Sequence, residues 1–365
     1  MCGAGRWSGQ PAGDNPGPQK GATTLNLDEL LRHAVAEEAS DVHLSQGQPP
    51  VFRINGTLTR RGDQPLTADD MEQVVDQITP RDARRKLEEM GEVDFSFGVA
   101  GLSRFRVNVY RQRGALAVAL RIIPFRIMSL AELGLPSTLE TFCDLPHGLV
   151  IVTGPTGSGK STTLAALIDL INERYSRHVI TIEDPIEHLH RNKRSIVHQR
   201  EVGSDTRTFG RALRAALRQD PDVILLGEIR DLDSIRIALQ AAETGHLVFT
   251  TLHTNDAPSS VDRIIDVFPP EQQQQVRVQL AATLQGVVAQ RLVPRIDRPG
   301  RVVAVEILLV NAAVRNLIRE GKTHQLPSII QTSGRTGMQS MAASLRELVR
   351  RGVISPEEAG QDSSL

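Results

Sequence analysis

The segment LVIVTGPTGSGKS, residues 149–161, determines the architecture of the larger part of this 365-residue chain. Its first part, 149–153, is a run of apolar and β-branched residues that predicts a buried strand, and residues 164–168 are typical of a helix. The residues between them fit the pattern G-x-x-x-x-G-K-[ST] of a phosphate-binding loop. A chance glycine-rich turn is the alternative, but a strand before the loop and a helix after it favour phosphate binding.

The parts of this loop have separate chemical roles. Glycines let backbone N–H groups turn inward toward phosphate oxygens, and the N-terminus of the next helix adds the positive end of its dipole. Lys160 is expected to reach the β- and γ-phosphates, and the Ser161 hydroxyl is expected to hold Mg²⁺. The predicted ligands are therefore ATP and Mg²⁺. The predicted nucleotide-binding residues are Gly154, Pro155, Thr156, Gly157, Ser158, Gly159, Lys160, Ser161 and Thr162.

Length and composition limit the classes of protein that fit. A chain of 365 residues favours two domains, and 40% hydrophobic with only 3% aromatic residues predicts a globular, aliphatic core. The net charge of −1 gives no general attraction to nucleic acid or to a membrane surface. Single-strand binding usually needs basic grooves with aromatic platforms, so no direct nucleic-acid partner is expected.

Cysteine use and the chain start predict a cytoplasmic protein. Cys2 and Cys143 are far apart and form no C-x-x-C motif, which argues against a disulfide framework and a structural zinc site. No apolar run approaches the roughly 20 residues that span a bilayer. Residues 1–24 are rich in Gly and Pro and lack the apolar segment of a signal peptide, so we predict a disordered tail there.

Residues 25–123 predict a small α+β domain. Helices are expected at 27–39 and 67–78, with Thr67 and Asp70 as a cap pair, and Asn55-Gly56 signals a hairpin turn. The expected strands are 41–45, 51–54, 93–97, 105–109 and 117–123. Residues 124–136 read as a linker with one short helix.

Residues 137–310 predict an α/β domain, because strands alternate with helices there. The expected strands are 149–153, 178–183, 222–227, 247–252 and 302–309. Such alternation predicts a parallel sheet with crossover helices. Residues 311–365 are expected to form a helical C-terminal region.

Two acidic strand ends are candidates for the chemistry. Glu183 and Glu187 follow the apolar strand at 179–182, and Glu228 follows the strand at 222–227. Carboxylates at the carboxyl ends of parallel strands face the crevice where nucleotides bind. Phosphate-loop enzymes commonly place an aspartate before the second glutamate, but this chain has Gly227 there. Mg²⁺ must then depend on Ser161, on phosphate oxygens and on Glu228 or Glu183.

We assign Glu228 to activate the attacking water and Glu183 to the catalytic site. A salt bridge to Arg230 is the alternative for Glu228, and helix capping or a charged loop is the alternative for Glu183 and Glu187. His253 follows the strand at 247–252 and is assigned as a sensor of the γ-phosphate, with a structural histidine as the alternative.

Arginines complete the predicted site, because a guanidinium stabilises charge on phosphate oxygens in the transition state. Individually each is expected at the surface, but as a set we expect at least two to contact phosphate, some from a neighbouring subunit. Arg104 and Arg106 alternate with apolar residues and so share one face of a strand. The candidates are Arg104, Arg106, Arg113, Arg121, Arg214 and Arg218.

Taken together, these motifs resemble the secretion-type ATPases, most closely the PilT-like type IV pilus retraction ATPases of twitching motility. The resemblance covers about residues 27–354. The matching segments are ASDVHLS at 39–45, DFSF at 94–97, RFRVNV at 104–109, ITIEDPIE at 180–187, the atypical Walker B segment at 220–231 and the His box at 244–254. That family also lacks the usual Walker B aspartate.

The C-terminal region resembles the retraction members in particular. Residues 313–320 read AVRNLIRE, similar to that group's A-I-R-N-L-I-R-E motif, with Val314 in place of isoleucine. An ordinary amphipathic helix is the alternative, since Val314, Leu317 and Ile318 share one face. The residues assigned to the retraction motif are Arg315, Asn316, Leu317, Ile318, Arg319 and Glu320.

The resemblance implies a PAS-like N-terminal domain, a RecA-like P-loop ATPase core and a homohexamer with active sites between subunits. It implies ATP hydrolysis that powers pilus retraction, and docking on a platform protein at the cytoplasmic face of the inner membrane. A pilus-assembly or type II secretion ATPase is an alternative, although such proteins usually carry a four-cysteine zinc loop. An accessory retraction paralogue is a further alternative.

Overall fold

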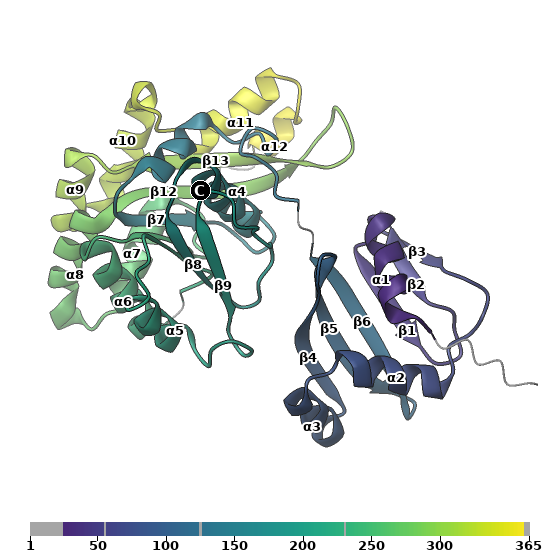
Figure 1. The fold of residues 1–365 in the computed structure, drawn as a ribbon. Coiled ribbons are helices and arrows are strands. Elements are labelled where there is room, and N and C mark those ends of the chain that lie inside the picture. Colours follow the sequence, from purple (N-terminus) through teal and green to yellow (C-terminus); the bar gives the residue numbers. More distant parts are fainter. Residues whose placement is uncertain (1–24, 55, 124–125, 230, 361–365) are drawn as a thin grey trace, which may run out of the picture. The chain divides into compact units, whose positions relative to one another are not determined.

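The computed structural model describes residues 25–54, 56–123, 126–229 and 231–360. The chain forms two compact units, which divide between Ile122 and Ile123, with Ser103–Phe105 assigned to the second unit (Figure 1). The predicted tail at 1–24, Asn55 of the predicted hairpin and Arg230 lie outside the described residues.

The first unit is built on a six-stranded sheet with the order β3-β2-β1-β6-β5-β4. Central strand β1 is antiparallel to both neighbours, β2 and β6. The elements are α1 (Leu27–Ala36), β1 (Asp41–Ser45), β2 (Val51–Ile54), β3 (Thr57–Arg60), α2 (Ala68–Ile78), α3 (Arg81–Met90), β4 (Glu92–Val99), β5 (Ser103–Gln112) and β6 (Ala115–Ile123).

Most of these elements agree with the expected ones, and the Thr67–Asp70 capping box is present. Helix α3 was not predicted, because seven of the ten residues in its sequence RDARRKLEEM are charged and it buries only Ala83 and Leu87. A glycine ends it, since Gly91 adopts φ +82°.

The second unit is built on a seven-stranded sheet with the order β13-β12-β7-β11-β10-β8-β9. Its elements up to the last strand are η1 (Ser137–Asp144), β7 (Gly148–Thr153), α4 (Lys160–Arg174), β8 (His178–Glu183), β9 (Ile196–Glu201), α5 (Phe209–Ala216), β10 (Val223–Leu226), α6 (Leu232–Glu243), β11 (Leu247–Thr251), α7 (Ala257–Asp266), α8 (Pro270–Thr283), β12 (Leu284–Pro294) and β13 (Arg301–Leu309). The C-terminal elements are α9 (Ala312–Arg319), η2 (Thr323–Gln325), α10 (Leu326–Thr332), η3 (Gly334–Thr336), α11 (Met341–Arg350) and α12 (Pro356–Gly360).

The expected wholly parallel sheet is wrong at one edge. Strands β12, β7, β11, β10, β8 and β9 run parallel, but β13 pairs antiparallel with β12. Sequence analysis missed β12 because Gln285, Gly286 and Gln290 interrupt its apolar pattern. It also missed β9, whose sequence IVHQRE is mostly polar.

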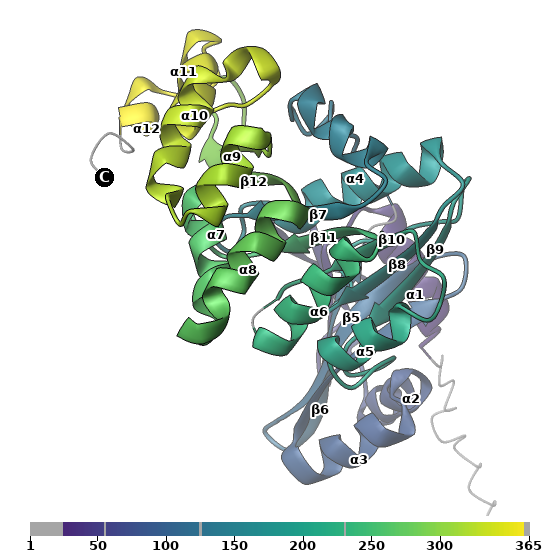
Figure 2. The ribbon, with the colours of Figure 1, turned by 90° about the vertical axis from the view of Figure 1, so that its left-hand side faces the viewer.

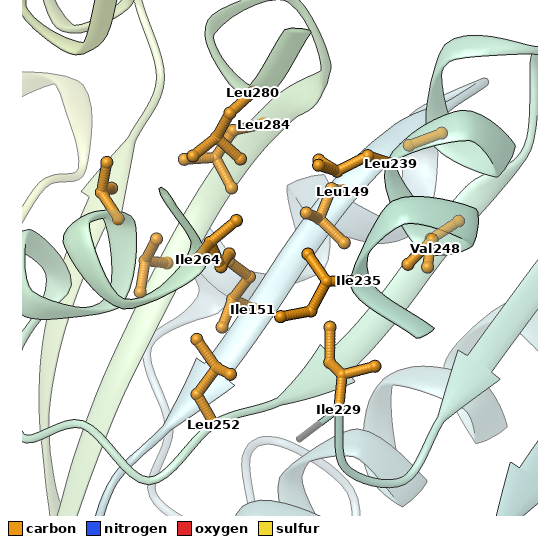
Figure 3. Packing of buried hydrophobic residues seen from close by; sticks show 14 of the residues in the cluster. Leu149, Ile151, Ile229, Ile235, Leu239, Val248, Leu252, Ile264, Leu280 and Leu284 are labelled. Atoms are coloured by element: carbon orange, nitrogen blue, oxygen red, sulfur yellow. The ribbon is translucent and has the colours of Figure 1, made fainter. Parts of the chain in front are cut away.

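Alternate residues of the strands supply two cores, one on each face of this sheet. Leu149 and Ile151 point toward α6, α7 and α8 (Figure 3). Helices α6 and α8 pack side by side on that face (Figure 2). Val150 and Val152 point to the opposite face, where α4 and η1 cover them. Burial on both faces explains why the strands read as continuous apolar runs.

The segment expected to be a linker is partly built into the second unit. Leu130 and Leu135 are buried in the same core as Phe142. The expected short helix does not form: residues 130–134 make a turn, in which Gly134 adopts φ +73°. Leu135, which precedes Pro136, is disfavoured in a helix.

Candidate functional site

The phosphate loop joins β7 to α4, as the sequence predicts. Gly154, Gly157 and Gly159 adopt φ values of +143°, +77° and +89°, which strongly favour glycine. A Cβ on Gly154 would lie 2.2 Å from the Gln290 carbonyl oxygen and 2.8 Å from the Ser158 hydroxyl. The loop therefore forms a tight cradle against β12 that has no room for a larger residue at position 154.

Lys160, in the first turn of α4, is almost completely buried. Its ammonium donates hydrogen bonds to the carbonyls of Gly154 at 2.7 Å and Pro155 at 3.1 Å. Burial lowers the pKa of Lys160, and the carboxylates of Glu228 and Glu187 partly oppose that shift. The side chain thus stands over the loop, facing acidic residues from two other strand ends.

A cavity of about 790 Å³ opens in front of the loop and the neighbouring strand ends. Its wall brings together Lys160, Ser161, Glu183, Glu228 and His253, which the sequence places far apart. They meet because β7, β8, β10 and β11 are parallel neighbours, so that their carboxyl ends share one edge of the sheet.

Glu228 and His253 form a contact that spacing alone could not predict. The His253 Nε2 lies 3.0 Å from the Glu228 Oε2. The alternative partner for Glu228, Arg230, lies outside the described residues. A histidine at this distance can orient the carboxylate or sense its charge.

The close packing of neighbouring backbones explains why residue 227 is a glycine. A Cβ there would lie 3.3 Å from Glu183 Cα and 3.5 Å from the Ile182 carbonyl oxygen. The Gly227 carbonyl also accepts a hydrogen bond from the Thr251 hydroxyl on β11. The backbones of β8 and β10 therefore approach closely at the position where other phosphate-loop enzymes carry an aspartate.

Glu183 has an unusual environment at the end of β8. Burial raises the pKa of its carboxyl to about 7, against hydrogen bonds that favour the ionised form. The Thr181 hydroxyl donates to Oε1 at 2.6 Å, and the Gln199 amide donates to the same oxygen at 3.3 Å. A carboxyl that titrates near neutral pH in a cavity is typical of functional sites.

Several residues of the cavity and the loop were not predicted. The Gln290 amide, buried on β12, donates to the Ser158 carbonyl at 2.7 Å and so supports the phosphate loop from below. Leu292 and Arg301 form part of the cavity wall. No motif indicated them; a polar glutamine within the apolar run 284–293 was the only signal.

His188 and His190 also line the cavity. Burial lowers the pKa of both, that of His190 to about 4 with contributions from His188 and Lys193. The Nδ1 atom of each ring is buried and has no hydrogen-bond partner. Both imidazoles are therefore held neutral in the wall of the cavity.

Of the six predicted arginines, Arg104, Arg214 and Arg218 belong to the same compact unit as the cavity, and none of these three lines it. Arg104 and Arg106 do alternate with buried residues on β5, and Arg113 occupies the two-residue turn between β5 and β6 with φ +49°. The Arg121 Nε lies 3.0 Å from Asp41. On and after α5, Arg214 pairs with Asp233 and Arg218 donates to the Arg214 carbonyl at 2.9 Å. Contact of these arginines with phosphate stays a prediction.

The predicted retraction motif forms helix α9 and the residue after it. Arg315 donates hydrogen bonds to the carbonyls of Ala281 and Ala282 at the end of α8, and to Gln285. Arg319 and Glu320 are exposed, while Leu317 packs partly against the core. The Asn316 side-chain amide donates a hydrogen bond to the Glu320 carboxylate at 2.8 Å. Ile318 is fully buried, so the expected amphipathic helix is present; the role of the motif in retraction stays a prediction.

Comparison with known proteins places this geometry in a family. The family described as "Type II/IV secretion system protein" matches residues 19–361. The chain belongs to this family. Within the described residues, none of the helices has the length and apolarity needed to cross a bilayer.

Members of the type II/IV secretion family with named functions are similar over almost the whole chain. A type IV pilus retraction ATPase, PilT of Pseudomonas aeruginosa, is 47% identical, over 93% of this chain and 99% of its own length. The type IV pilus ATPase PilU of the same organism is 39% identical, over 92% and 88%. A crystal structure of the pilus retraction motor PilT with bound ADP is 50% identical, with a TM-score of 0.85 over 93% of this chain and 98% of that chain.

Proposed function

We propose that this protein is an ATP-hydrolysing motor that powers type IV pilus retraction and twitching motility. The observation that carries the proposal is the cavity in which the phosphate loop meets Glu183 and the Glu228–His253 pair. The similarity to a retraction ATPase along nearly its full length supports the biological role.

The site residues divide the chemistry of phosphoryl transfer to water. Loop N–H groups and Lys160 bind the phosphates and stabilise the charge that develops on them. Glu228 orients the attacking water, and His253 holds the Glu228 carboxylate in place. Glu183 lies at the adjacent strand end and provides a second carboxyl whose charge changes near neutral pH.

A divalent cation fits this donor set. Ser161 is half-buried in the first turn of α4, and both it and Glu228 line the cavity. Hydroxyl, carboxylate and phosphate oxygens are the ligands Mg²⁺ prefers. When bound with ATP, Mg²⁺ neutralises charge on the phosphates.

The assembly follows the same reasoning. The protein is a homohexamer of PAS-like domains (25–123) and RecA-like ATPase domains (137–310), joined by the 124–136 segment, with a C-terminal helical region at 311–365. Arginines such as Arg104, Arg106 and Arg113 complete a neighbour's site. The ring works at the cytoplasmic face of the inner membrane, on the pilus platform protein.

Two related roles are alternatives. A pilus-assembly or type II secretion ATPase shares the same catalytic core. An accessory retraction ATPase is a further alternative, but identity to the retraction ATPase PilT, at 47%, is higher than identity to the type IV pilus ATPase PilU, at 39%.

The first experiment separates binding from hydrolysis. Lys160→Ala is expected to abolish tight ATP binding, whereas Glu228→Gln keeps binding and lowers kcat by about 10²-fold or more. Normal turnover in Glu228→Gln would remove Glu228 from the water-activating role.

The second experiment tests the cellular role. A deletion strain should keep its pili but lose pilus movement, and the wild-type gene should restore it. Leu317→Ala should fail to restore movement while keeping ATPase activity, with Leu317→Met as the control for lost packing. Loss of all pili in the deletion strain would instead indicate an assembly motor.

A further inference from the structure

Gln199 lies on β9, in a position that no motif indicated. In the parallel pairing of β8 with β9 it is directly opposite Thr181. Residues directly opposite each other on paired strands point to the same face of the sheet. Both side chains reach the same atom, the Glu183 Oε1.

The Gln199 amide uses both of its ends. Its Nε2 donates to the His188 carbonyl at 2.8 Å and to Glu183 Oε1 at 3.3 Å. Its Oε1 accepts from the His190 backbone N–H at 2.8 Å. A glutamine is suited to this position because it carries donors and an acceptor on one planar group.

The segment after Glu183 follows β9 backwards along its length. Glu201 accepts a hydrogen bond from the Ile186 N–H, Gln199 binds residues 188 and 190, and the Asn192 side chain accepts from the Val197 N–H. Positions 199 and 201 share a face because strand side chains alternate. The cavity wall at 183–190 therefore joins the backbone ladder of the edge strand at Glu183, whereas its later residues, 186–190, are attached to that strand through side chains.

We propose that Gln199 is the positioning residue of the catalytic site: it fixes the Glu183 carboxyl and the His188–His190 wall in their working arrangement. The inference rests on the proposed ATPase function, because it assigns Gln199 to the carboxyl that acts there. Without the amide, the 183–190 wall loses its attachment at two backbone groups, and Glu183 keeps only the Thr181 hydroxyl as a side-chain donor.

The charges around Glu183 determine in which direction a substitution of Gln199 shifts the pKa of the Glu183 carboxyl. Glu187 raises the pKa of the Glu183 carboxyl, while the backbone N–H of Glu187 donates to it and lowers the pKa. Lys160, Glu228 and the two neutral imidazoles line the same cavity. A negative charge at position 199 would add to the raising side, since like charges disfavour ionisation.

Two substitutions separate the functions of the amide. Gln199→Met has a similar volume and removes all three hydrogen bonds. Gln199→Glu keeps an acceptor for the His190 N–H but, when ionised, cannot donate to the His188 carbonyl or to Glu183. His198→Ala is the matched control, because His198 is the adjacent residue of β9, points to the other face and bonds His178 at 3.0 Å.

The readout is the pH dependence of steady-state ATP hydrolysis by the full chain with Mg²⁺. Gln199→Glu is expected to move the acidic limb of the kcat profile up by about one pH unit, which at pH 7.5 lowers kcat about threefold. KM for ATP should stay within about threefold, since the phosphate loop is unchanged. Gln199→Met should also move the acidic limb of the kcat profile to higher pH. His198→Ala should leave both kcat and its pH profile unchanged.

The proposal is overturned if both Gln199 variants keep the wild-type pH profile, even where their thermal stability falls, since that is a purely structural effect. An equal effect of His198→Ala would also overturn it. Lys160→Ala, measured in parallel, distinguishes the two levels of inference. If Lys160→Ala keeps ATPase activity, the proposed function fails; if it is inactive while Gln199 variants are normal, only the role of Gln199 fails.

Discussion

The protonation of Glu183 predicts a pH-dependent stability that can be measured without nucleotide. Burial raises the pKa of its carboxyl from an ordinary 4.5 to about 7, so the folded protein binds the proton more tightly than the unfolded chain. Between these pH values the free energy of unfolding should fall as pH rises, because the folded state holds more protons. Below 4.5 the neutral carboxyl causes no loss, and above 7 the loss is complete.

The size of the effect follows from the two pKa values. A difference of about 2.5 in pKa, at 1.36 kcal/mol per pH unit, corresponds to about 3 kcal/mol. Glu183→Gln replaces the carboxyl by a neutral group of the same shape and should not show this loss. The stability of the variant relative to wild type should therefore rise by about 3 kcal/mol from pH 4.5 to pH 8.

The assay is urea denaturation of the full chain, followed by far-UV circular dichroism in steps across that range. Glu187→Gln is the control, since it removes a negative charge from the same cavity. A difference between Glu183→Gln and wild type that does not change with pH would refute the reasoning, as would an equal pH dependence in Glu187→Gln.

Three further predictions concern the loop, the C-terminal helix and the buried thiol. Gly154→Ala should abolish ATP binding and lower the free energy of unfolding by about 2–4 kcal/mol, because of backbone strain and the close approach to β12. Gly157→Ala, where a Cβ would meet open space, should lower it by only about 1–2 kcal/mol. Equal ATP binding by both variants in equilibrium titrations would contradict the tight packing of the loop at position 154. Arg315→Ala should lower the free energy of unfolding by about 1–3 kcal/mol, because it leaves the last carbonyls of α8 without their donor. The matched change at an exposed position, Arg319→Ala, should alter it by less than about 0.5 kcal/mol. Identical denaturant unfolding curves for the two variants would argue against this helix cap. Burial and the nearby acidic charge raise the pKa of Cys143 to about 12, so in a background lacking the other cysteine the native thiol should not react with a disulfide reagent at pH 8 until the protein is unfolded, and rapid native labelling would disprove it.

Sequence analysis located the strands of the catalytic face well. The runs that form β7, β8, β10 and β11 are apolar because each is largely buried, so hydrophobicity alone indicates them, and β13 was found although only part of it is buried. Strand β12, the other neighbour of β7, could not be predicted in the same way, since its Gln290 binds the phosphate loop rather than filling the core. The polar residue that binds the loop thus interrupts the apolar pattern by which a buried strand is recognised.

The candidate site was predicted residue by residue but not as contacts. The phosphate loop, Glu183, Glu228 and His253 were all assigned, and the structure places them in one cavity. The pairing of Glu228 with His253 depends on the order of strands in the sheet, which local sequence does not encode. Gln199 was missed because most of its partners are backbone groups. Every residue has such groups, so no sequence motif marks the positions that bind Gln199.

The close approach at Gly227 has an evolutionary consequence. Gly227→Asp would require the backbone near Glu183 to shift by a few tenths of an ångström, and it would add a negative charge beside a carboxyl whose pKa burial already raises. The common metal-binding aspartate is therefore disfavoured as a single substitution in this background. A change of the metal site at this position would first need the ends of β8 and β10 to move apart.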